Sequence, residues 1–179
     1  MLKMKRPKTK ALALIADLLE YPSAEFIDGL DSTCKTLSAF YPEPGKHLEA
    51  LHSELTKLRK EELEELFTRT FDLAPICNPY LSSYIWGDEN YERGSLMQEL
   101  SNRYNQLELP LNGELPDHLK VVLNACQYFE EDEVRELTKY VLIPALKEMQ
   151  ASLDSNNNPY RHLLHAISSV LDSQPLRES

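Results

Sequence analysis

The helices of this chain are divided by the stretch Asn112-Gly113-Glu114-Leu115-Pro116-Asp117-His118-Leu119, which separates two long helical patterns. Asn112 and Gly113 both tolerate a positive φ and predict a turn. Pro116 has a fixed φ and no amide hydrogen, so we expect it in the first turn of the next helix. Asp117 would cap that helix, where free N–H groups and the helix dipole favour a carboxylate. This hinge also brings two carboxylates and an imidazole together.

Apolar residues recur at helical spacing on both sides of the hinge. Their stripes predict helices around residues 9–20, 26–37, 48–58, 63–70, 96–107, 119–129, 134–141 and 163–171, a short helix over 79–87, and a helix restarted at Pro144 that reaches about Leu153. Prolines and a glycine predict a break at Tyr41-Pro42-Glu43-Pro44-Gly45. No strand-length alternation competes with these patterns. The fold class is therefore all-α, a single-domain bundle of roughly eight to ten helices.

The charge of the chain is strongly negative and unevenly distributed. The net charge is −10, but residues 1–10 contain five basic residues and no acidic one, so the other 169 residues carry −15. A body this acidic repels phosphate backbones, which argues against a nucleic-acid partner. It would attract a basic peptide.

The ends and the cysteines indicate a cytoplasmic protein. We expect a basic, mobile arm at residues 1–10, a helical domain at 11–173 and a disordered tail at 174–179. The apolar run Ala11–Ala16 is too short for a signal peptide and is followed by Asp17 and Glu20. No stretch is long enough to span a membrane. The three cysteines are far apart and odd in number, which predicts reduced thiols rather than a disulfide framework or a zinc site.

Catalytic motifs are scarce in this sequence. There is no glycine-rich phosphate-binding loop and no nucleophile motif. His162 and His165 lie three apart on a predicted helix and could share a metal ion, but no metal-binding motif accompanies them. A surface or core histidine pair is therefore favoured, and a metal-dependent hydrolase using His162 and His165 is kept as an alternative.

A set of short motifs resembles one protein family. The motifs, in order, are Phe71-Asp72-Leu73, Tyr80-Leu81, Gly87-Asp88, Arg93-Gly94 and Leu115-Pro116-Asp117-His118-Leu119-Lys120-Val121-Val122-Leu123. Their order and separation resemble those of the NarJ branch of the TorD/DmsD family, cytoplasmic assembly chaperones for molybdoenzymes. The similarity is strongest over residues 66–129 and extends from about 11 to 153. One departure is Asn124-Ala125, where the family usually has Glu-Phe. This chain has no carboxylate at that position, so the role of the family's glutamate is not carried over.

The resemblance implies a TorD-like fold and a non-catalytic chaperone with no cofactor of its own. Such a chaperone would bind the N-terminal segment, a twin-arginine signal or its remnant, of a molybdoenzyme catalytic subunit. Respiratory nitrate reductase alpha is the first candidate client, and another molybdoenzyme of the same superfamily is the alternative. The chaperone would support molybdenum cofactor insertion before membrane docking, without itself inserting into the membrane, as a monomer or homodimer.

Ten residues in and near these motifs are expected to bind the partner. Apolar contact is expected from Tyr80, Tyr84 and Trp86, and Phe71 and Pro116 are also expected to line the binding site. Carboxylates expected to pair with arginines of the partner are Asp72, Asp88, Glu114 and Asp117. His118, near a helix start, could report pH.

Overall fold

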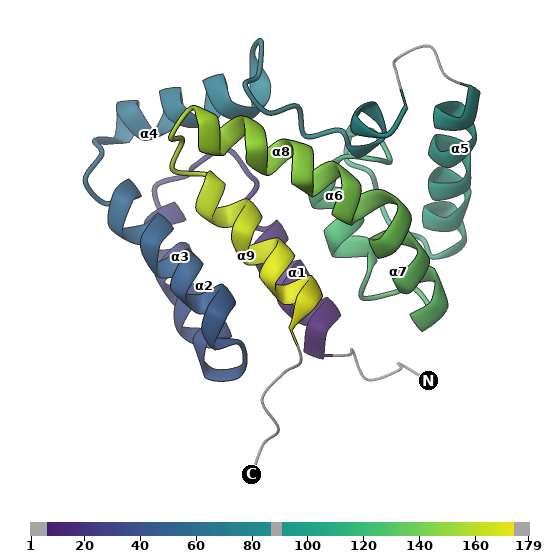
Figure 1. Cartoon of the computed structure of the whole chain (residues 1–179), viewed down its shortest axis with the longest axis horizontal. Coiled ribbons are helices and arrows are strands. Elements are labelled where there is room, and N and C mark those ends of the chain that lie inside the picture. The colour runs from purple at the N-terminus through teal and green to yellow at the C-terminus, as the bar shows by residue number, and fades with distance from the viewer. Residues whose placement is uncertain (1–6, 87–90, 174–179) are drawn as a thin grey trace.

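A computed structural model describes residues 7–86 and 91–173 of the chain. In these ranges the chain forms helices and one isolated β-bridge, with no longer strand, which confirms the all-α prediction. The helices, shown in Figure 1, are α1 (Pro7–Ala16), α2 (Phe26–Phe40), α3 (Pro42–Leu55), α4 (Lys60–Phe67), α5 (Tyr91–Gln106), α6 (Leu119–Ala125), α7 (Glu131–Leu137), α8 (Ile143–Ser155) and α9 (Arg161–Asp172). Shorter segments are the π-helical η1 (Thr68–Asp72) and η3 (Thr138–Leu142) and the 3-10 helix η2 (Leu81–Tyr84).

Helix α9 occupies the centre of the bundle (Figure 1). It packs against α1, α3 and α8, and its side chains Leu163, Ile167 and Val170 are completely buried. Helix α1 also packs against α6, whereas α5 lies at one edge of the bundle and contacts η2. Within the described ranges, no helix combines the length and the apolar character needed to cross a bilayer.

The predicted break at residues 41–45 is present but is confined to Tyr41, and residues 42–45 form the first turn of the next helix. Helix α2 ends at Phe40, α3 begins at Pro42, and only Tyr41 lies between them. Proline is favoured in a first helical turn because its missing N–H would have no partner there. Gly45 allows the two helices to approach, since a Cβ at this position would lie 2.9 Å from the Cα of Ser38.

The hinge also differs from its prediction. Helix α6 begins at Leu119 rather than at Pro116, and its cap is His118, whose Nδ1 accepts the Lys120 N–H at 3.1 Å. The antiparallel bridge to Tyr80 holds His118 in an extended conformation, so the helix cannot begin before Leu119. Asp117 is therefore not the helix cap.

The two chain ends are described only in part. Helix α1 begins at Pro7, and the Lys8 Nζ donates to the Leu171 carbonyl at 2.8 Å, so residues 7–10 belong to the bundle rather than to a mobile arm. The predictions for residues 1–6 and 174–179 lie outside the described residues. All three cysteines are buried free thiols, as expected from their spacing.

Candidate functional site

A hollow of about 330 Å³ opens beside the hinge. It unites five of the ten residues expected to bind the partner, which are Phe71, Asp72, Tyr80, Glu114 and His118. Its other lining residues are Leu19, Glu20, Tyr21, Phe67, Pro79 and Lys120. We call this site the hinge hollow.

One wall of the hinge hollow is aromatic and comes from the end of α4 and from η1. The ring centroids of Phe67 and Phe71 lie 5.5 Å apart, and Tyr21 meets Phe67 edge-on at 5.8 Å. Behind this wall the completely buried Tyr160 packs edge-on against Phe71 at 5.0 Å. Phe71 is itself buried at the base of the hollow, whereas Asp72, the last residue of η1, is exposed. The wall therefore offers a supported apolar surface with a carboxylate at its edge.

Helix α4 reaches this wall through a wide turn. The Leu73 N–H donates to the Thr68 carbonyl at 3.0 Å, which is the five-residue spacing of a π-helix. The side chain of Asn158 holds the turn from the other side, because its Nδ2 donates to the Thr70 Oγ1 at 2.8 Å. Such π-turns often occur at functional sites. No feature of the sequence predicted this one.

The opposite wall is formed where two distant segments pair across the bridge. The Leu81 N–H donates to the Asp117 carbonyl at 3.0 Å, and the Leu119 N–H donates to the Pro79 carbonyl at 2.8 Å. The rings of Tyr80 and His118 meet edge-on with centroids 5.4 Å apart. The Tyr80-Leu81 motif and the hinge motif are therefore two halves of one wall.

Asp117 holds these two segments together from inside. Its side chain is 0% exposed, and its Oδ2 accepts both the N–H of Ser82, at 3.1 Å, and the Ser82 hydroxyl. The Ser82 Oγ in turn accepts the Nε–H of Arg93 at 2.8 Å. The Asp117 Oδ1 is buried and has no hydrogen-bond partner among the described residues. The expectation that Asp117 meets an arginine of the partner is therefore corrected: the carboxyl faces the interior and positions the wall.

Glu114 is the carboxylate that the wall presents to the hollow. The Tyr80 hydroxyl donates to its Oε1 at 3.3 Å, and the His118 Nε2 lies 3.1 Å from its Oε2. Because the Nδ1 of His118 is the acceptor that caps α6, the proton of the neutral ring is on Nε2 and points at Glu114. The carboxylate is thus held by two donors while its side chain stays 42% exposed.

The ring of His118 is favoured in its neutral form. Burial lowers the pKa of His118 below its usual range, although the nearby Glu114 and Asp117 oppose this shift. Burial also raises the pKa of Tyr80, together with the charge of Glu114, so that the hydroxyl stays protonated and can donate.

Two charged residues of the hollow were missed by sequence reasoning. Glu20 and Lys120 form an ion pair across the mouth. They lie far apart in the sequence. Glu20 stands outside the motifs, and Lys120 belongs to the hinge motif but was not among the residues expected to bind the partner. Together with Glu114 and the exposed Asp72, which has no ion pair among the described residues, the lining contains three carboxylates and one ammonium group. The hollow is therefore acidic as well as aromatic.

Three of the expected residues lie elsewhere. Tyr84 donates its hydroxyl to the Asn78 carbonyl at 2.7 Å, Trp86 donates its Nε1–H to Glu92 at 2.7 Å, and the carbonyl of Pro116 accepts the Tyr104 hydroxyl at 2.8 Å. The hinge hollow is lined by none of them. For Tyr84 and Trp86 the reason is that η2 turns the chain away after Tyr80. Asp88 lies outside the described residues.

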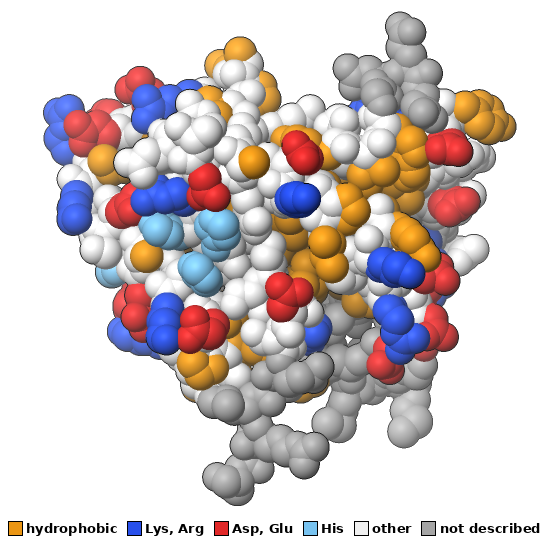
Figure 2. Space-filling view, in the orientation of Figure 1, with side chains coloured by type: hydrophobic (Ala, Val, Ile, Leu, Met, Phe, Trp, Pro, Cys, Tyr) orange, Lys and Arg blue, Asp and Glu red, His pale blue; other side chains and the backbone are white. Residues whose placement is uncertain are grey.

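The histidines on α3 and α9 form a separate group on the face shown in Figure 2. The His162 Nε2 lies 2.8 Å from Glu54, the His165 Nε2 lies 3.0 Å from Asp154, and the rings of His47 and His165 stack at 5.7 Å. His162 and His165 each pair with a different carboxylate rather than sharing a centre. Among the described residues, no group of three or more metal-ligating side chains is placed to hold a metal ion, so the hydrolase alternative gains no support here.

The match to known proteins identifies the family. The model of the nitrate reductase delta subunit family matches residues 35–166. This chain belongs to that family, and the predicted resemblance is confirmed. A Bacillus subtilis protein named a probable nitrate reductase molybdenum cofactor assembly chaperone, NarJ, is 32% identical over 120 residues, covering 66% of this chain and 64% of the relative's own length.

A solved structure has the same fold as this chain. The crystal structure of a redox enzyme maturation protein from Archaeoglobus fulgidus matches with a TM-score of 0.63 and 20% identity, covering 97% of this chain and 99% of the other. At this identity the likeness concerns the fold alone.

Proposed function

We propose that this chain is a non-catalytic chaperone that binds the N-terminal segment of a molybdoenzyme catalytic subunit. By family, the first client is nitrate reductase, whose segment carries a twin-arginine signal or its remnant. The chaperone acts in the cytoplasm, supports insertion of the molybdenum cofactor into the client and delays membrane docking. The observation that carries the proposal is the hinge hollow, where a surplus of carboxylates surrounds an aromatic wall in a member of this family.

The chemistry of the hollow suits a basic segment with an apolar neighbour. A guanidinium group pairs well with a carboxylate that is already oriented, and both oxygens of Glu114 are held by donors from the same wall. Asp72 offers a second carboxylate at the edge of the aromatic wall. Apolar side chains of the segment would lie on Tyr21 and Phe67, and an amphipathic peptide in a groove between helices is a common recognition mode.

A titration tests the binding step. The full chain is titrated with a synthetic peptide that copies the N-terminus of the nitrate reductase catalytic subunit from the same organism, at rising salt. We expect micromolar or tighter binding that weakens with salt, because exposed charges are screened. A peptide with its arginines replaced by glutamine is the control and should bind more weakly. Absence of binding at low salt would contradict the proposal.

The client itself tests the assembly step. In cells that lack this protein, we expect the nitrate reductase polypeptides to be made but to contain less molybdenum cofactor than in the parent strain. Normal cofactor content in nitrate reductase, with a deficit in another molybdoenzyme, would assign the alternative client. Full cofactor content and activity in every molybdoenzyme would refute the assembly function.

A further inference from the structure

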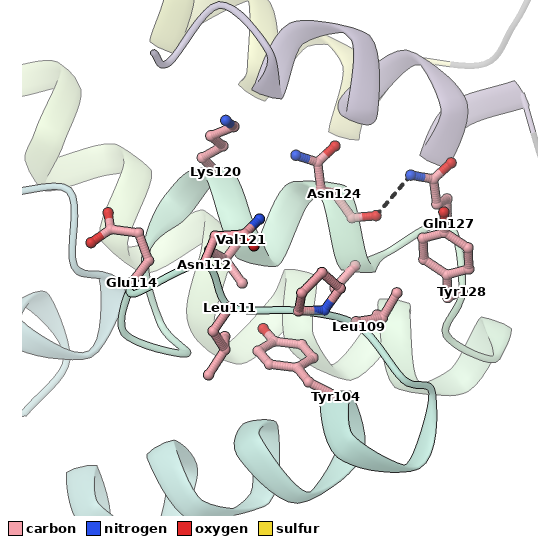
Figure 3. Close-up of a pocket in the computed structure, with 12 residues that line it drawn as sticks. Tyr104, Leu109, Leu111, Asn112, Glu114, Lys120, Val121, Asn124, Gln127 and Tyr128 are labelled. Carbon is pink, nitrogen blue, oxygen red and sulfur yellow. Dashed lines mark hydrogen bonds between the residues drawn. The ribbon is translucent and has the colours of Figure 1, made fainter. Parts of the chain in front are cut away.

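A second hollow, of about 300 Å³, adjoins the hinge hollow and shares Glu114 and Lys120 with it. It lies between α6 and residues 109–114, and Figure 3 shows side chains from both segments around it. We call it the α6 groove. Because the same two side chains line both hollows, a segment bound in the hinge hollow can continue into the α6 groove.

The α6 groove differs chemically from the hinge hollow. Its floor is apolar, since Leu109, Leu111 and Val121 pack partly buried against the core. Side-chain amides replace the carboxylates along it, on Asn112, Asn124 and Gln127. Its charged lining residues are the shared Glu114 and Lys120 at the end next to the hinge hollow. An amide both donates and accepts hydrogen bonds, so this lining complements the main chain of an uncharged segment.

Residues of α6 and of the turn after it present this polar edge. Lys120, Asn124 and Gln127 follow one another at helical spacing and rise from the same side in Figure 3. The Gln127 Nε2 donates to the Asn124 carbonyl at 3.0 Å, which orients the Gln127 amide. The helix rise of about 1.5 Å per residue makes α6 about 10 Å long, room for roughly three residues of extended chain.

The wall opposite α6 has a set shape. Asn112 and Gly113 adopt positive φ angles of 53° and 85°, and Glu108 adopts 54°. The Leu109 N–H donates to the Tyr104 carbonyl at 2.9 Å, and the Glu114 N–H donates to the Leu111 carbonyl at 3.0 Å. These bonds hold the segment against α5 and the hinge. A groove that is already formed avoids much of the ordering cost of binding.

We infer that the α6 groove binds, in extended form, the uncharged residues that adjoin the basic anchor of the client segment. This inference rests on the proposed function, because the anchor must occupy the hinge hollow. The occupant follows from the continuity of the two hollows and from the change from carboxylates to amides along them. The hinge hollow selects charge, and the α6 groove adds affinity through main-chain hydrogen bonds and the apolar floor.

Two peptides and a matched pair of variants test the inference. The long peptide copies the client N-terminal segment, and the short one keeps only the basic residues and their immediate neighbours. Asn124→Leu removes an amide from the groove at similar size, whereas Asn102→Leu removes an exposed amide from α5. We expect Asn124→Leu to weaken the long peptide about threefold to tenfold and to leave the short peptide unchanged. Asn102→Leu should change neither affinity.

The outcomes separate this inference from the proposed function. Equal losses for both peptides, or equal affinity of both peptides for the unmodified protein, would overturn the α6 groove while the hinge hollow stands. Binding of neither peptide would overturn the proposed function and the inference with it.

Hydrogen exchange on the unmodified protein gives a second measurement that does not depend on how a variant folds. The long peptide should slow amide exchange at residues 109–114 and 124–128, and the short peptide should not. Protection confined to the hinge hollow with both peptides would overturn the inference.

Discussion

The hinge and the histidine-bearing face of α3 and α9 both pair imidazoles with carboxylates, yet the two regions are built differently. At the hinge, His118 has 12% side-chain exposure and joins a helix cap, a carboxylate and an aromatic ring. On the other face, His162 and His165 pair with Glu54 and Asp154 on the surface of packed helices. An imidazole beside a carboxylate therefore does not by itself mark a site.

Both regions connect segments that are distant in sequence, but only the polar groups of the hinge line the hinge hollow. The buried Asp117 holds the wall together, and the half-exposed Glu114 is what the wall presents. The α3–α9 face has neither a buried carboxylate nor an aromatic wall among these pairs. Four substitutions or pairs of substitutions compare the two regions in stability, peptide affinity and pH dependence.

The largest expected effect is on stability at the hinge. Asp117→Ala removes the acceptor of two buried Ser82 donors, and hydrogen bonds to a charged group contribute about 1.5–3 kcal/mol each. We therefore expect a loss of about 3 kcal/mol or more in the free energy of unfolding, measured by urea denaturation. Asp154→Ala in α8, which removes the partner of His165 on α9, is the matched control and should lose about 1 kcal/mol or less. Similar losses in both variants would contradict the structural role of Asp117.

The next effect concerns partner binding. Glu114→Gln keeps the size of the side chain and removes the charge that the hinge hollow presents. We expect peptide affinity to fall at least about tenfold, or 1.4 kcal/mol, in calorimetric titration. Glu54→Gln makes the same change on the α3–α9 face and should leave affinity unchanged. If Glu54→Gln weakened binding as much as Glu114→Gln, the hinge hollow would not be the binding site.

A smaller effect is the dependence of stability on pH. Because burial lowers the pKa of His118, the unfolded chain binds a proton at a higher pH than the folded protein does. The contribution of neutral His118 to the unfolding free energy is complete above the usual histidine pKa of about 6.5 and is lost as pH falls below that value. His118→Asn keeps a good helix cap and removes the titration, so the decline in unfolding free energy below that pH should become shallower.

The other face supplies the comparison for this pH effect. Burial also lowers the pKa of His47, helped by the neighbouring His165 and His162 and opposed by Glu43. His47→Gln should therefore reduce the pH dependence in the same direction, and the two changes should add because the sites are separate. If His118→Asn left the pH dependence of the unfolding free energy unchanged, the ring of His118 in the unmodified protein would titrate alike in the folded and unfolded chain.

The smallest expected effect is on the histidine face itself. The pair of His165 and Asp154 is partly exposed, and such pairs contribute about 0–1 kcal/mol. His165→Gln should change the melting temperature little and leave peptide affinity unchanged. Added zinc should not raise the melting temperature of the unmodified protein. A zinc-dependent rise that His165→Gln abolished would restore the metal-dependent alternative.

Much of the fold could be predicted because its signals are local. The apolar stripe of α9 appears in the sequence as Leu163, Ile167 and Val170, and all three are core residues. The helix boundaries were less predictable. The predicted break at residues 41–45 narrows to Tyr41, because Pro42 already lies in the first turn of α3. The start of α6 is set by a bridge to Tyr80 that no local pattern encodes.

The site could be predicted only in part. Phe71, Tyr80 and Glu114 were expected to bind together and do line one hollow, because they belong to the motifs that form its walls. Tyr84 and Trp86 lie in the same stretch of sequence, but η2 directs them elsewhere. Proximity in sequence does not determine which side of a turn faces a hollow.

By itself, the sequence determined that this chain is all-α, acidic and divided at residues 112–119, because periodicity, charge and turn residues are local properties. Only the tertiary structure decided the roles of the two hinge carboxylates. Asp117 is buried because Ser82, 35 positions away, meets it inside the wall. Glu114 stays accessible because Tyr80 and His118 hold it at the mouth of a hollow that Glu20 and Lys120 complete. Burial depends on what packs against a residue from elsewhere in the chain, and no local pattern carries that information.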